Sequence, residues 1–66
     1  MYRKEILIEF VDRSRLLRNE IAERLEMSEK AFKEALNGRS EFKALQIFRL
    51  VELLNIREPG KIFFAD

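Results

Sequence analysis

The segment SEKAFKEALNG most constrains what this chain can fold into, because it carries both the start signal and the stop signal of one short helix. Ser28 is a favoured N-cap residue, since its hydroxyl can accept a hydrogen bond from a free amide of the first turn. Glu29 places a negative charge at the positive end of the helix dipole. Gly38 can adopt the left-handed conformation that ends a helix without a steric clash at Cβ. The pattern predicts a helix over residues 28–37.

The segment before this helix admits two interpretations. Residues 3–13 place Leu7, Phe10 and Val11 at the i, i+3, i+4 spacing of an amphipathic helix. The run ILIEFV is also rich in side chains that favour strands. A lone strand would need a partner that the rest of the sequence hardly offers, so we favour a helix, and the alternative over residues 5–11 stays open.

Two further segments have helical spacing. RLLRNEIAERL carries Leu17, Ile21, Ala22 and Leu25 at helical positions. A later helix is predicted at about 44–55, with Ile47, Leu50, Val51 and Leu54 on one stripe. REPG ends that helix, and KIFF follows as a short helical turn or an extended tail. We predict an all-α fold, a compact bundle of four or five short helices that contains a helix-turn-helix.

Composition limits what kind of protein this is. The chain has 66 residues, which suit a single domain over residues 1–66. It has no cysteine and no histidine, which excludes disulfides and zinc sites of the Cys/His type. It also lacks a Gly-rich phosphate loop and a Ser-His-Asp set. We therefore expect no enzyme activity, no metal, no cofactor and no small-molecule substrate.

Hydropathy and charge bear on location and partners. No apolar run is long enough to cross a membrane, and the N-terminus lacks a signal-peptide layout, so we expect a cytoplasmic protein without membrane contact. The formal net charge is +1. A strong nucleic-acid footprint would be more basic than this. The small basic excess gathers in residues 1–18 and 28–43.

The two central helices have the layout of a helix-turn-helix. In that motif the first helix crosses the second at a steep angle, with a small residue such as Ala22 at the crossing. The second helix presents its polar face to the major groove of DNA. Any small helical bundle contains such hairpins, so the spacing alone leaves DNA reading and plain core packing open.

Residues 19–56, NEIAERLEMSEKAFKEALNGRSEFKALQIFRLVELLNI, resemble the helix-turn-helix of the Cro/CI (XRE) repressor family of phages and bacteria. The shared pattern is A-x-x-L-x-x-S followed by N-G, and then a helix that ends in LLNI. The resemblance implies a sequence-specific DNA-binding transcriptional regulator whose partner is double-stranded operator DNA. It also implies that the helix at 28–37 is the recognition helix.

On this resemblance, the exposed face of residues 28–37 would meet the major groove. Lys30 and Lys33 lie one turn apart on that face, and we expect both to contact DNA. Ser28 would donate to a phosphate in addition to capping the helix. Glu29 either accepts a hydrogen bond from a cytosine amino group or serves only the helix dipole.

Phosphate contacts are expected on both sides of the recognition helix. Arg18 stands where the family usually has glutamine, and an arginine there keeps affinity for phosphate. Asn37 and Arg39 lie where the chain would leave the groove, and Lys43 begins the following helix. All four are DNA-binding candidates.

The chain departs from the family pattern around the turn. Leu17 occupies the position where the family has a capping threonine, so Ser14 would cap the helix earlier or Asn19 later. Glu26 occupies the position of the turn glycine. That residue must therefore adopt a positive φ, or the turn differs from that of the family.

A second departure is a glutamate on the recognition helix. Glu34 lies where the family often presents Arg, Gln, Ser or Thr. It either contacts DNA or pairs with Lys30 at the i, i+4 spacing. Because a carboxylate repels phosphates, it lowers non-specific affinity.

Three phenylalanines are candidates for a homodimer interface. Phe48 lies off the apolar stripe of its helix, and it either forms an interface or packs beneath the KIFF tail. Phe63 and Phe64 are assigned mainly to closing the core, with one of them a candidate for the dimer contact. A second function fits the near-neutral charge and the glutamates: a protein-interaction module on the same fold, such as an anti-repressor or a phage inhibitor, that does not bind DNA.

Overall fold

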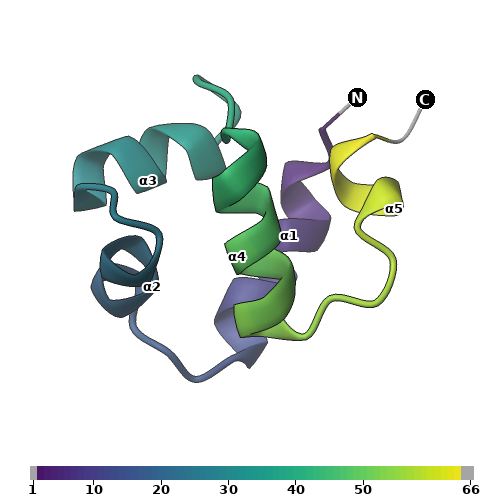
Figure 1. Cartoon of the computed structure of the whole chain (residues 1–66), viewed down its shortest axis with the longest axis horizontal. Helices are drawn as coiled ribbons and strands as arrows, with labels where there is room; N and C mark the ends of the chain where they lie inside the picture. The colour runs from purple at the N-terminus through teal and green to yellow at the C-terminus, as the bar shows by residue number, and fades with distance from the viewer. Residues whose placement is uncertain (1, 65–66) are drawn as a thin grey trace.

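The chain folds into helices that are joined by short loops (Figure 1). A computed structural model describes residues 2–64. The helices are α1 (Lys4–Arg13), α2 (Arg18–Arg24), α3 (Glu29–Leu36), α4 (Ala44–Leu54) and α5 (Gly60–Phe63). No strand occurs among the described residues, so the predicted all-α fold of four or five helices is confirmed.

The N-terminal segment is a helix, and the strand alternative is wrong. α1 turns Leu7 and Val11 into the core, where each is almost fully buried. The Arg3 amide donates a hydrogen bond of 2.7 Å to the Ile62 carbonyl oxygen of α5. The KIFF segment forms part of the short helix α5, and its Ile62 is also buried. The two ends of the described chain are thus held together.

The core is formed by one apolar face from each helix. Its buried residues are Leu7, Val11, Ile21, Ala22, Leu25, Phe32, Leu36, Leu50, Leu54, Ile56 and Ile62. No polar or charged side chain is buried among residues 2–64. Hydrophobic burial therefore dominates the stability of the fold, and the charged side chains are left for the surface.

The start of α2 differs from both sequence expectations. The N-cap position is Leu17, and neither Ser14 nor Asn19 caps the helix. The Leu17 amide donates to Oε1 of Glu20 at 3.0 Å, so the glutamate satisfies one amide at this end of the helix. Ser14 serves α1 instead, because its hydroxyl donates to the Val11 carbonyl oxygen at 2.6 Å.

The end of α2 confirms the positive φ expected at Glu26, which is +58°. The Met27 amide donates to the Ala22 carbonyl oxygen at 2.9 Å, and the Glu26 amide donates to Glu23 at 3.0 Å. These two bonds form a Schellman motif. α2 therefore turns sharply into α3, although the residue at the turn is not glycine.

Replacing Glu26 by glycine is expected to raise the free energy of unfolding by about 0.5–1 kcal/mol, because glycine avoids the left-handed Cβ clash. The gain is a net value, since the variant also loses the exposed ion pair between Glu26 and Arg49 at 3.0 Å. Glu26→Ala is the control, because it loses the ion pair and keeps the strain. Urea unfolding followed by circular dichroism measures both. If Glu26→Gly and Glu26→Ala were equally stable, the positive φ at residue 26 would not be strained.

α3 begins and ends at the residues that its sequence predicts. The Ser28 hydroxyl accepts a hydrogen bond of 3.0 Å from the Ala31 amide, which confirms the N-cap. Gly38 has a φ of +82°. The Arg39 amide donates to the Glu34 carbonyl oxygen at 2.9 Å and closes the C-terminal turn. The position of the exposed face of α3 is therefore set by both ends of the helix.

Candidate nucleic-acid interface

α2 and α3 pack against each other across the short turn at residues 25–28. In Figure 1, α3 lies across the view, whereas α2 is seen close to end-on, so the two helices cross steeply. Ala22 of α2 and Ala35 of α3 are buried small residues. The outer face of α3 is left free of any other helix in the described chain (Figure 1).

The outer face of α3 presents the two predicted lysines. Lys30 and Lys33 are both exposed, and no carboxylate among residues 2–64 lies within ion-pair distance of either. Glu29 is also exposed, at the first position of the helix. The face thus carries two unneutralised positive charges and one negative charge at its N-terminal end.

Glu34 does not pair with Lys30, so the predicted i, i+4 ion pair is wrong. Its carboxylate lies 3.7 Å from the guanidinium of Arg39. The reason is the Schellman turn at Gly38, which brings the chain back over the last turn of α3. Arg39, a candidate phosphate ligand, is therefore partly neutralised within the chain.

Arg18 is likewise paired within the chain. Its guanidinium donates to Asp12 of α1 at 3.3 Å. Both side chains are largely exposed, so this bond is weak and competes with water. Arg18 can therefore exchange Asp12 for another anion at small cost.

The other predicted polar residues occupy helix ends. Asn37 is the half-buried C-cap residue of α3. Lys43 is the exposed N-cap residue of α4, and its amide donates to Oε1 of Gln46 at 2.8 Å. Ser28 uses its hydroxyl as an acceptor in the α3 cap, which leaves the hydroxyl hydrogen available to an anion.

The three candidate interface phenylalanines have different surroundings. Phe48 is 59% exposed and is not among the described side chains that pack on the core. Phe64 is 67% exposed. Phe63 is half-buried and packs on the core, as expected for a residue that closes it. An interface role therefore remains available to Phe48 and Phe64.

Sequence reasoning missed the role of Tyr2. Its hydroxyl donates a hydrogen bond of 2.9 Å to the Leu36 carbonyl oxygen at the C-terminal end of α3. Its ring packs with Phe42 and Phe63, which come from the α3–α4 loop and α5. The only signal in the sequence is that Tyr2 is the single tyrosine, and that does not reveal its partners.

Burial raises the pKa of the Tyr2 hydroxyl from 10.0 to about 12, and the Glu5 carboxylate adds to the rise. We expect the ultraviolet absorbance of tyrosinate to appear near pH 12 in the folded protein and near pH 10 in urea. Because the unfolded chain loses this proton first, the stability from the neutral hydroxyl is complete below pH 10 and is lost toward pH 12. A Tyr2 titration midpoint near pH 10, in protein that is still helical, would contradict the raised pKa of this hydroxyl.

No helix within residues 2–64 is long and apolar enough to span a bilayer. In the same part of the chain, no three acidic, cysteine or histidine side chains lie close enough together to hold a metal ion. Comparison of the chain with models of protein families, with characterised proteins and with solved structures finds no match. Fold and site define a small compact all-helical domain with an exposed lysine-bearing helix.

Proposed function

We propose that the protein is a sequence-specific DNA-binding regulator, similar to the Cro/CI repressors, in which α2 and α3 act as the helix-turn-helix. The exposed outer face of α3, with no carboxylate partner for Lys30 or Lys33 among residues 2–64, is the observation that carries the proposal. α3 is one helix of the size that enters a major groove, and its inner face is held by the core. The protein would act by occupying operator DNA.

Six of the eight predicted DNA contacts then have a stated role. Lys30 and Lys33 read base edges or bind phosphates from α3, and Ser28 donates its hydroxyl hydrogen to a phosphate. Arg18 and Lys43 bind phosphates on either side of the helix. Arg39 does so by leaving Glu34, which is a small cost because the Arg39 side chain is 77% exposed.

Selection of binding sites from random duplex DNA tests this proposal. We expect an enriched sequence, and two inverted half-sites if the protein binds as a dimer through Phe48 or Phe64. Binding to the selected duplex, followed by fluorescence anisotropy, should weaken steeply as salt is added. Enrichment of no sequence, together with no saturable binding at low salt, would rule the proposal out.

The second candidate is a protein-interaction module on the same fold. It is favoured by the two ion pairs, Arg18 with Asp12 and Arg39 with Glu34, which neutralise part of the basic surface. The net charge of only +1 points the same way. A protein that binds no duplex but captures a defined protein partner, and loses it on changes to the α3 face, would establish this alternative.

A further inference from the structure

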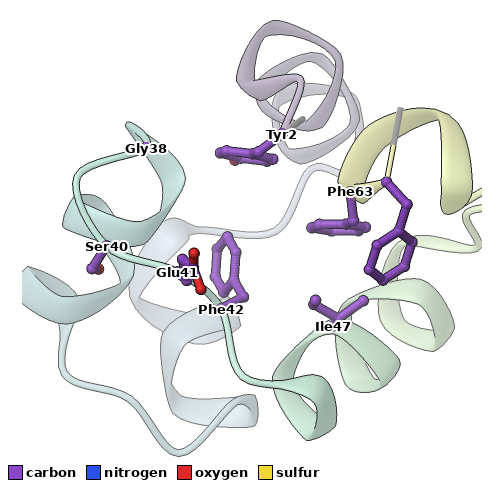
Figure 2. A pocket seen from close by; sticks show the side chains of 8 residues that line it. Tyr2, Gly38, Ser40, Glu41, Phe42, Ile47 and Phe63 are labelled. Carbon is purple, nitrogen blue, oxygen red and sulfur yellow. The ribbon is translucent and has the colours of Figure 1, made fainter. Parts of the chain in front are cut away.

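An open cleft with a volume of about 460 Å³ lies between the N-terminal segment, the α3–α4 loop and α5 (Figure 2). This volume is within the range of pockets that bind small molecules. Four of its lining side chains are aromatic, namely Tyr2, Phe42, Phe63 and Phe64, and one is the carboxylate of Glu41. No lysine or arginine among the described residues lines it. Among the described residues, the cleft is thus lined by aromatic rings and one acidic side chain.

Three of the rings hold one another in place. The rings of Tyr2 and Phe63 are almost parallel, with 7° between their planes and 5.9 Å between their centroids. The Phe42 ring stands nearly perpendicular to both, with its centroid 6.2 Å from each of theirs. The Tyr2 hydrogen bond to Leu36 anchors the group to α3. A ligand would therefore meet largely preformed aromatic walls, and little side-chain entropy is lost on binding.

The fourth ring and the carboxylate lie at the edges of this group. The Phe64 ring is tilted by 57° to that of Phe63, with 6.4 Å between their centroids. In Figure 2 the Glu41 carboxylate lies beside Phe42. Glu41 is exposed, and it forms no ion pair with another residue of the described chain.

We propose that this cleft binds a small organic cation of the alkylammonium class. The faces of aromatic rings carry partial negative charge and attract cations, and alkyl groups on the nitrogen lower its cost of desolvation. The free Glu41 carboxylate supplies the complementary charge. One carboxylate supplies too few ligands to favour a simple metal cation, and its charge disfavours an anion. Lys30 and Lys33 do not line the cleft, so the inference does not depend on their binding to DNA. It does require that Phe64, which lines the cleft, is free of a dimer contact.

Titration with choline tests the proposal, using nuclear magnetic resonance of the aromatic side chains. The fluorescence of Tyr2 is a second reporter, because the protein has one tyrosine and no tryptophan. We expect saturable changes at Tyr2, Phe42 and Phe63. Dimethylbutanol, the neutral carbon isostere of choline, should bind about tenfold more weakly or not at all. No saturable binding of choline, or equal binding of the isostere, would overturn the proposal.

Two variants and two matched controls locate the site. Glu41→Gln and Phe64→Ala should each weaken choline binding by about fivefold. Glu52→Gln and Phe48→Ala remove an exposed carboxylate and an exposed ring outside the cleft, and they should leave binding unchanged. All four positions are exposed, so each variant should remain folded. Equal losses in variants and controls would overturn the assignment.

Discussion

Replacing Lys30 and Lys33 together by alanine is expected to lower the affinity for duplex DNA by about tenfold or more. It should also make the dependence of log affinity on log salt shallower by about two, because each lysine that binds a phosphate displaces about one counterion. Both lysines are exposed and lack a carboxylate partner among residues 2–64, so their charges are available to a polyanion. Anisotropy titrations at several salt concentrations measure both effects.

The control for this pair is Lys4→Ala, which removes an exposed lysine from the first turn of α1. It should change DNA affinity by much less than the pair does. The substitutions lie on exposed helix positions, where alanine is a good helix former, so circular dichroism should be unaltered. If the variant with both lysines replaced bound DNA as tightly as the native chain, α3 would not be part of the DNA interface.

Replacing Phe32 by alanine is expected to lower the free energy of unfolding by about 3–5 kcal/mol, the usual cost of deleting a buried aromatic ring. Phe32 is only 1% exposed and belongs to the core that α3 shares with α1 and α2. A domain of this size has a total stability of about 3–10 kcal/mol. The variant should therefore be partly or wholly unfolded at ambient temperature, as thermal unfolding by circular dichroism will show.

Phe48→Ala is the matched control, since it deletes the same ring from a site that is 59% exposed. The change in unfolding free energy there should be within about 0.5 kcal/mol. If the two variants were equally stable, the contrast in burial between the two rings would be wrong. If Phe48→Ala alone were destabilised in a concentration-dependent way, Phe48 would lie at a subunit interface.

Local signals predicted the helices well. Ser28 marks the start of α3 and Gly38 its end, as expected, because a cap and a left-handed turn depend on hydrogen bonds within a few residues. The resemblance left two alternatives at Glu26, a positive φ or a different turn, and the structure shows the positive φ. The start of α2 was missed, because the helix begins at Leu17 without a capping hydroxyl and its Leu17 amide instead donates to the Glu20 carboxylate.

Partners of side chains were predicted less well. Glu34 sits at helical spacing from Lys30, yet it pairs with Arg39, because the turn after α3 brings that arginine closer. Arg18 lies against Asp12, which belongs to a different helix. The positive charge that the surface can offer a partner depends on these ion pairs, so it could not be predicted from the composition of the chain.

The sequence by itself determined where most helices begin and end, which faces are apolar, and that neither cysteine nor histidine chemistry is present. These properties arise from neighbours along the chain and from residue types. Only the tertiary structure decided which charges on the α3 face stay free. It alone brought Tyr2, Phe42 and Phe63 together around a cleft. The physical reason is that both depend on side chains from helices and loops far apart in sequence, whose meeting is set by how the core packs.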